Sequence, residues 1–381
     1  MLTAIKTVPF ANAVWAGKIN LFERGKTAKI MNSQQWNIIK DCAAMKPLGK
    51  VPVALIVDSP WIPGYTGITT LDYFTSPEIW LKANLKVIHD FPDIIFLPGF
   101  WVEYGMATEP SGFGCKISFY ENNLPHVYPA INSVDEISKL YIPNPKTDGL
   151  MPFVLNIYKQ IKDRVSQEGH LIKVVASRGP FTIASHVMGL TNFLVNIKIE
   201  PESTHKILKL ITEFIIIWLE AQMDVLKEVE GIMILDDVAG FISRDDFIEF
   251  AYPYFKKIFS TYSNFVKIYH NDTDNPVPYE FLGELGVNIF NFTHLRNISD
   301  VRKIVGDKVC LMGNVPPLHV LAEGNADLVK EKAMECIKDN GNMPGFILSA
   351  GGGTSPKTPG ENIAALCSAA ELFSRDINGS K

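Results

Sequence analysis

The sequence predicts one closed (β/α)8 barrel, and two patterns along its 381 residues carry this prediction. First, short runs of apolar or β-branched residues recur eight times, and most are followed by a helical pattern. Second, each run is continuously apolar, as in parallel strands that are covered on both faces. The expected strands are residues 51–58, 93–98, 171–177, 231–237, 265–270, 287–292, 308–313 and 345–349.

The helices between these strands have recognisable starting residues. Ser76, Ser133 and Ser243 each place a hydroxyl before an apolar-periodic run, with an acidic residue close behind. Residues 201–230 form the longest predicted helix, because their large apolar side chains recur at helical spacing.

The interval between the second and third strands is too long for a simple crossover. Residues 115–120 and 126–131 flank a short polar turn, a pattern typical of a β-hairpin. We therefore expect a single domain over residues 1–381, with an N-terminal helical extension at 1–50 and a hairpin insertion at 113–131.

Composition excludes several classes of protein. The 36 basic and 41 acidic residues give a net charge of −5, and no basic run forms a stripe that could follow a nucleic-acid backbone. The five cysteines are widely spaced and include no C-x-x-C pair, which argues against a disulfide scaffold or a thiolate-only zinc site. The N-terminus lacks a secretion signal, and the most apolar stretch is far shorter than a membrane span. We expect a cytoplasmic protein without nucleic-acid or membrane partners.

The predicted fold itself selects candidate functional residues. In (β/α)8 barrels, catalytic groups come from the C-terminal ends of the strands and the loops after them. In strand order, the candidates are residues 58–65, 100–103, 177–179, Asp236 and Asp237, residues 270–272, His294, Asn314, and residues 350–355.

A metal site is one interpretation of the strongest candidates. Asp236, Asp237 and His270 follow adjacent strands, so their carboxylates and imidazole can meet at one metal ion. Glu249, early in the helix that follows, could face the same rim. The alternative is that Asp237 caps a helix or holds a loop, while His270 forms hydrogen bonds in a polar barrel mouth. Spacing alone leaves both interpretations open.

The loops after the first two strands are rich in aromatic residues. We expect Trp61, Tyr65, Trp101 and Tyr104 to line an open mouth and to bind the substrate. The alternative is that these side chains pack the loops onto the barrel. A glycine run at 351–353 resembles a phosphate cradle but matches no phosphate-binding motif, and it also suits close approach of the chain to a ligand.

Five separated segments carry a resemblance to a known family. They are residues 179–185, 235–240, 250–254, 312–317 and 347–362, which include the sequences GPFTIAS, LDDVAG, FAYPY and MGNVPP. On these segments the chain resembles the uroporphyrinogen decarboxylase superfamily over nearly its whole length, which independently implies a (β/α)8 barrel. The superfamily contains both decarboxylases and corrinoid-dependent methyltransferases, so the fold does not specify the reaction.

Two branches of the superfamily fit this sequence poorly. The decarboxylase branch has an arginine-rich stretch after the first strand that binds the carboxylates of its tetrapyrrole, and residues 58–65 contain no arginine. The branch that methylates coenzyme M carries an H-x-C zinc pattern and a later cysteine. Here His270 is followed at the second position by Asp272, and residues 350–353 contain no cysteine.

A third branch transfers methyl groups from methoxylated aromatics to a corrinoid protein, and its zinc is associated with two glutamates and a histidine. Glu249 and His270 match the second half of that pattern, while Ile234 stands at the first position, so Asp236 or Asp237 is the expected substitute. The resemblance therefore implies an O-demethylase-type methyltransferase that uses zinc as a Lewis acid and cob(I)alamin on a corrinoid partner protein.

The resemblance also suggests roles for individual residues. Asp236, Asp237, Glu249 and His270 are the expected metal ligands, with Asp237 and His270 also taking part in catalysis. Alternatively, His270 or His294 delivers a proton to the ether oxygen without a metal. Asn314 either orients the substrate or holds its own turn. Other functions that remain open are a methyltransferase for a thiol, methylamine or tetrahydrofolate, a decarboxylase with an unusual anion clamp, and a non-catalytic corrinoid-binding or tetrapyrrole-binding module.

Overall fold

The computed structural model describes residues 32–379, so most of the predicted N-terminal extension lies outside the described residues. Within the described part, the extension contains the helix α1 (Ser33–Ala43). This helix starts at a capping box in which the Asn32 side chain accepts from the Gln35 backbone and the Gln35 side chain reaches back.

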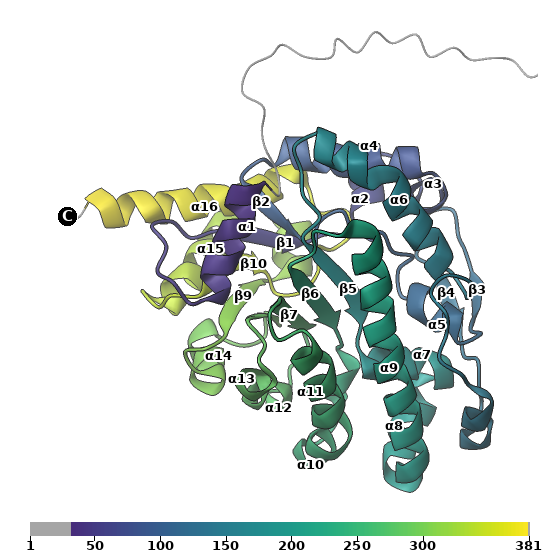
Figure 1. Cartoon of the computed structure of the whole chain (residues 1–381). Helices are drawn as coiled ribbons and strands as arrows, with labels where there is room; N and C mark the ends of the chain where they lie inside the picture. Colours follow the sequence, from purple (N-terminus) through teal and green to yellow (C-terminus); the bar gives the residue numbers. More distant parts are fainter. Residues whose placement is uncertain (1–31, 380–381) are drawn as a thin grey trace, which may run out of the picture.

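Eight parallel strands form a nearly closed barrel in the order β2-β1-β10-β9-β8-β7-β6-β5 (Figure 1). The predicted fold class is therefore confirmed, with every expected strand present. The observed bounds are β1 (Val53–Ile56), β2 (Ile94–Leu97), β5 (Val174–Arg178), β6 (Gly231–Leu235), β7 (Val266–Asn271), β8 (Ile289–Phe292), β9 (Cys310–Val315) and β10 (Phe346–Ala350).

Helices follow the strands and surround the sheet (Figure 1). They are α2 (Ile62–Thr66), α3 (Thr70–Thr75), α4 (Pro77–Asp90), α5 (Thr108–Gly112), α6 (Met151–Gln167), α7 (Pro180–Met188), α8 (Leu190–Ile199), α9 (Pro201–Leu226), α10 (Arg244–Asp246), α11 (Tyr252–Thr261), α12 (Val277–Glu280), α13 (Leu282–Leu285), α14 (Ile298–Val305), α15 (Ala326–Asn340) and α16 (Gly360–Gly379). Short 3-10 turns η1 (Val134–Lys139) and η2 (Val238–Phe241) and π-helical turns η3 (Phe247–Ala251) and η4 (Pro317–Ala322) complete the described elements.

Two of the three predicted helix starts are capped as expected. The Ser76 hydroxyl accepts from the Ile79 backbone at α4, and the Ser243 hydroxyl accepts from Asp246 at α10. Ser133 instead precedes the 3-10 helix η1 and makes no capping bond. Prolines at positions 143 and 145 follow closely, and they prevent this segment from continuing as an α-helix.

The insertion between β2 and β5 contains the predicted hairpin. β3 (Lys116–Ser118) and β4 (His126–Tyr128) pair antiparallel, with Ile117 opposite Val127. The long helix α9 begins where the sequence predicts and ends at Leu226, because Lys227 has a φ of 66° that an α-helix does not allow.

Two buried clusters explain why the strands are continuously apolar. Along β1, Val53 and Leu55 pack in the layer between sheet and helices, while Ala54 and Ile56 point into the barrel. The inner cluster also contains Trp36, Ile39 and Cys42 of α1. Because α1 covers the end of the barrel at which the strands begin, the opposite, C-terminal end is the one that can hold a site.

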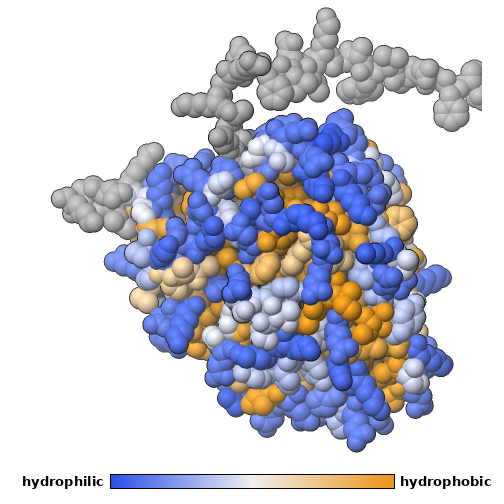
Figure 2. Space-filling view, in the orientation of Figure 1, coloured by the Kyte–Doolittle hydropathy of each residue, from blue (hydrophilic) through white to orange (hydrophobic). Residues whose placement is uncertain are grey.

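Polar side chains cover most of the face shown in Figure 2, with apolar patches between them. Within residues 32–379, none of the helices combines the length and the apolar character that crossing a membrane requires.

Candidate functional site

A small cavity lies at the C-terminal end of the barrel. Its volume is about 160 Å³, close to the roughly 150 Å³ of an engineered protein cavity that holds benzene. Several strand ends contribute to its wall, which consists of Ile56, Asp58, Pro60, Met106, Arg178, Thr182, Leu235, Asp237, His270, Gly353 and Thr354. The cavity therefore suits a ligand of about one aromatic ring.

Asp237, His270 and Asp272 form a candidate metal site at this cavity. One ligand atom from each residue lies within 4.8 Å of the others. Among residues 32–379, this is the group of histidine and carboxylate side chains that could hold a metal ion. His270 Nε2 is 3.5 Å from Asp237 Oδ1, and the Asp272 backbone N–H donates to the same oxygen at 3.1 Å. One nitrogen and two carboxylate oxygens equal in number the three protein ligands of catalytic zinc sites, which keep a fourth position open.

Strand register explains why these residues meet. Leu235 at the end of β6 pairs with His270 on β7, so the residues directly after β6 lie beside the end of β7. Burial raises the pKa of Asp272 above its ordinary value, and the negative charge of Asp237 adds to this increase. A divalent cation between the two carboxylates would remove that repulsion. The donor set and its charge therefore fit a metal ion.

Asp236 lies in a different environment from its neighbour. Its buried carboxylate accepts from the backbone of Phe181 at 2.8 Å and from the backbone and hydroxyl of Thr182 at 3.0 and 2.9 Å. These donors belong to the first turn of α7, whose backbone N–H groups lack helical partners. Burial raises the pKa of Asp236 to about 7. The structure thus assigns Asp236 to the attachment of α7 and not to the metal cluster.

Glu249 is also outside the cluster. It lies in η3, where Phe247, Phe250 and Ala251 are the buried residues, so its side chain faces outward and is 59% exposed. Its carboxylate is 3.7 Å from His205 Nε2 on α9. The candidate metal site therefore contains Asp272, which is not among the ligands predicted from the sequence, and it contains neither Asp236 nor Glu249.

His294 and Asn314 line a separate cavity of about 270 Å³, together with Arg296 and Cys336. The Asn314 side-chain nitrogen donates to the carbonyl oxygens of Thr293 at 3.0 Å and Arg296 at 2.6 Å. These bonds hold the loop after β8. The geometry therefore favours the structural alternative for Asn314. His294 does not line the mouth cavity, but its charge acts on the Asp272 carboxyl and lowers the pKa of that group.

Three of the four predicted substrate-binding aromatics pack outside the barrel. Trp61 stacks on Tyr65 with ring centroids 4.6 Å apart, and Tyr104 packs against Phe74 at 5.3 Å. These side chains belong to the layer between sheet and helices, as expected for loops that pack onto a barrel. Trp101 differs, because it belongs to the inner cluster and carries the Arg178 guanidinium 4.5 Å above its ring.

Arg178 is the cation of the mouth cavity, and motif analysis did not single it out. The side chain is 5% exposed, and it donates to the Gly105 carbonyl at 3.1 Å and to Met106 Sδ at 3.0 Å. These contacts and Trp101 hold the guanidinium in one position. The feature of the sequence that points to Arg178 is its position directly after a predicted strand.

Two further carboxyl groups lie beside Arg178. Glu103 Oε2 is 3.8 Å from the guanidinium, while Glu103 Oε1 accepts from the Ser59 backbone at 3.2 Å. Burial raises the pKa of Glu103 to about 7, with a further increase from the charge of Asp58. Burial also raises the pKa of Asp58, which lines the cavity.

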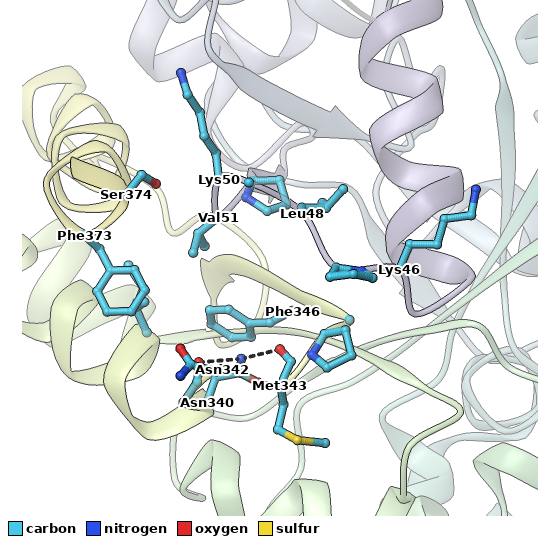
Figure 3. A pocket seen from close by; sticks show the side chains of 17 residues that line it. Lys46, Leu48, Lys50, Val51, Asn340, Asn342, Met343, Phe346, Phe373 and Ser374 are labelled. Atoms are coloured by element: carbon cyan, nitrogen blue, oxygen red, sulfur yellow. Dashed lines mark hydrogen bonds between the residues drawn. The ribbon is translucent and has the colours of Figure 1, made fainter. Parts of the chain in front are cut away.

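At the other end of the barrel, a pocket of about 230 Å³ lies between the α1–β1 loop, the α15–β10 loop and α16 (Figure 3). Asn340 lines it and donates to the Met343 carbonyl at 2.9 Å. Lys46 and Lys50 also lie along it, but it holds no group of metal-ligating side chains among the described residues.

Comparison with known proteins agrees with this architecture. A solved methyltransferase from Methanosarcina mazei has the same fold, with a TM-score of 0.75 and 24% sequence identity, over 87% of this chain and 97% of that protein. Among curated proteins, the uroporphyrinogen decarboxylase of Trichodesmium erythraeum (strain IMS101) is 26% identical over 299 residues, covering 75% of this chain and 80% of the relative. That of Anaeromyxobacter sp. (strain Fw109-5) is 24% identical over 348 residues, covering 86% and 96%.

The family model described as uroporphyrinogen decarboxylase (URO-D) matches residues 63–373. This match includes β2 to β10 and all residues of the mouth cavity except Ile56, Asp58 and Pro60. The chain therefore belongs to the uroporphyrinogen decarboxylase family.

Proposed function

We propose that this enzyme transfers a methyl group from a small methoxylated aromatic compound to cob(I)alamin carried by a corrinoid protein. The observation that carries the proposal is the group of Asp237, His270 and Asp272, of which Asp237 and His270 line a cavity of one-ring size. Two carboxylates and one imidazole favour a zinc ion that can act on an oxygen atom of the ligand.

The proposed reaction breaks the bond between the methyl carbon and the ether oxygen. The methyl group passes to the cobalt of the acceptor, which supplies the electron pair of the new bond, and the old bonding pair stays on the oxygen. Because an aryl oxide is a poor leaving group, the site must stabilise the developing negative charge. A zinc ion held here would supply that stabilisation as a Lewis acid, worth several kcal/mol.

The residues around the cluster position the donor. Ile56, Pro60 and Leu235 provide an apolar wall for the ring. Arg178, fixed over Trp101, can donate a hydrogen bond to a second oxygen of the ligand. The ether oxygen is thereby directed toward His270 and its neighbouring carboxylates.

Decarboxylation of a porphyrinogen is the second candidate, because the curated relatives bear that name. The charges of the mouth oppose it. Asp58 and Asp237 line the cavity, Asp272 lies beside Asp237, and Arg178 is the arginine of the cavity wall. A substrate with many carboxylates would meet repulsion here instead of a clamp.

The decisive experiment compares His270→Ala with His294→Ala. Each variant is assayed for bound zinc and for methyl transfer to cob(I)alamin from a panel of methoxybenzoates and methoxyphenols. We expect His270→Ala to lose zinc and at least about 10²-fold in rate, and His294→Ala to keep its zinc. Retention of both zinc and rate by His270→Ala would refute the mechanism.

A second comparison tests the ligand set. Asp272→Ala should lose zinc, because it removes one of three ligands, whereas Glu249→Ala should retain zinc, because Glu249 faces His205. The opposite result would restore the ligand set that the sequence predicts.

A further inference from the structure

Asn291 on β8 has an amide group whose orientation is fixed by its neighbours. The side chain is fully buried, and its nitrogen donates to the carbonyl oxygens of Met312 at 2.9 Å and Ala350 at 3.0 Å. A carbonyl oxygen only accepts hydrogen bonds, so the amide nitrogen must face these two groups. The amide oxygen therefore points the other way, and the network assigns nitrogen and oxygen without ambiguity.

The amide oxygen of Asn291 faces His270. The distance from His270 Nδ1 to Asn291 Oδ1 is 2.7 Å, a good hydrogen-bond length. Because this oxygen accepts, Nδ1 must carry the hydrogen. A neutral imidazole has one N–H group, so the lone pair of His270 is then on Nε2, the atom that faces Asp237.

The strand register makes this contact possible. His270 pairs with Asn291 across β7 and β8, and Asn291 pairs with Met312 across β8 and β9. The asparagine thus connects β8 to β7, β9 and β10 within the barrel. A buried amide is costly unless its hydrogen bonds are satisfied, and an apolar residue could fill the same space. An apolar residue could neither donate to the Met312 and Ala350 carbonyl groups nor accept from His270, and of these two roles the acceptor is the one that acts on the candidate site.

We infer that Asn291 is a positioning residue that fixes the tautomer of His270 and so presents its Nε2 lone pair to the Asp237–Asp272 side of the site. The hydrogen on Nδ1 follows from the hydrogen bonds alone, and for the neutral imidazole it leaves the lone pair on Nε2. Its consequence for metal binding rests on the proposed function. Outer groups of this kind fix the ring orientation of histidine ligands, and losing one costs roughly 10- to 100-fold in metal affinity.

The first test measures the tautomer in the wild-type protein. The protein is labelled with ¹⁵N-histidine, and a long-range ¹H–¹⁵N spectrum is recorded without metal at pH 8, where an ordinary imidazole is neutral. His270 is assigned from the signals that disappear in His270→Gln. We expect the form with hydrogen on Nδ1. A signal pattern for hydrogen on Nε2 would overturn the inference, whatever the protein binds.

The second test compares two replacements of Asn291. Asn291→Leu removes the acceptor, so we expect a mixture of tautomers and a zinc affinity lower by roughly 10- to 100-fold. Asn291→Asp keeps an acceptor opposite Nδ1 and, as the protonated acid, has one donor for the carbonyl groups of Met312 and Ala350. It should therefore retain the tautomer, with a zinc affinity closer to that of the wild type than that of Asn291→Leu. Zinc affinity is measured by competition with a chromogenic chelator, without substrate or corrinoid.

The control variant is Asn340→Leu. Asn340 is also buried and also donates to a backbone carbonyl, but it lies in the pocket at the opposite end of the barrel (Figure 3). The Asn340→Leu variant should keep the His270 tautomer and the zinc affinity of the wild type, even if the variant protein is less stable.

Each outcome decides a separate question. An unchanged tautomer and zinc affinity in Asn291→Leu would show that Asn291 is merely structural. If that variant does not fold, the wild-type spectrum and Asn291→Asp still decide. A wild-type protein that has the expected tautomer but binds no zinc would refute the metal in the proposed function and leave this inference intact.

Discussion

Asp236 and Asp237 are neighbours in the chain, yet their carboxylates serve different parts of the molecule. Asp236 accepts four hydrogen bonds, three from α7 and one from the Ala239 backbone at 3.4 Å. Asp237 instead lies 3.5 Å from His270 at the cavity. Successive residues at a strand end point in different directions, so one acidic pair can anchor a helix and also provide a ligand.

At the same scale, Glu103 should make stability depend on pH. Its pKa is about 7 in the folded protein, because it is buried and lies beside Asp58, and roughly 4.3 in an unfolded chain. A raised pKa means that the folded state binds the proton more tightly. The resulting stabilisation is complete below pH 4.3 and is lost as the pH rises through 7.

The free energy of unfolding of Glu103→Gln is compared with that of the wild type at each pH. From pH 5 to pH 8, this difference should shift in favour of the variant by about 2–3 kcal/mol. The free energy of unfolding is measured by urea denaturation at both pH values. Glu331→Gln, a replacement at an exposed glutamate, serves as control. An equal difference between Glu103→Gln and wild type at the two pH values would contradict this interpretation.

Among the elements, the glycine-rich turn after β10 brings three loops together. A Cβ atom on Gly351 would lie 2.6 Å from the His294 backbone nitrogen, and one on Gly352 would lie 2.7 Å from Asp272 Oδ2. Gly352 also has a φ of 135°, a conformation that other residues rarely adopt. The turn is glycine-rich because the ends of β7 and β8 lie against it, which explains the motif without a phosphate.

Gly352→Ala should weaken zinc binding, by about tenfold or more, because the new methyl group displaces the Asp272 carboxylate. Gly353→Ala is the matched variant, since a Cβ atom there would have no neighbour within 4 Å. Its zinc affinity should equal that of the wild type. Chelator competition measures both, and equal affinities for the two variants would show that Asp272 does not need this space.

For the molecule as a whole, the barrel has one covered end and one end that carries charge. Helix α1 contributes Trp36, Ile39 and Cys42 to the inner cluster at the covered end. The other end collects Asp58 and Arg178 with the Asp237–His270 pair in a cavity of about 160 Å³. Size and charge together favour a small ligand held beside a cation over a large polyanion.

At this scale we predict that the protein releases no CO2 from uroporphyrinogen III above background. A macrocycle with eight carboxylates exceeds the cavity and meets the acidic side chains of the mouth. The assay measures CO2 and partially decarboxylated products, with the Trichodesmium erythraeum relative as positive control. Turnover comparable with that control would establish the second candidate function and exclude the first.

The sequence by itself determined the barrel, because eight continuously apolar runs need cover on both faces, and it placed Asp237 and His270 at strand ends. The same rule marks the stretches that contain Asp58, Glu103, Arg178 and Asp272, whereas the resemblance implies Glu249 as a ligand. The choice among these candidates depends on which atoms meet across neighbouring strands.

Only the tertiary structure could make that choice. The register of β6, β7 and β8 brings Asp272 and Asn291 to His270, and the turn of η3 directs Glu249 toward His205. The packing of the first two loops places Trp61, Tyr65 and Tyr104 outside the barrel. A sequence pattern fixes spacing along the chain, whereas a site is made of contacts between segments far apart in it, and these follow from register and packing.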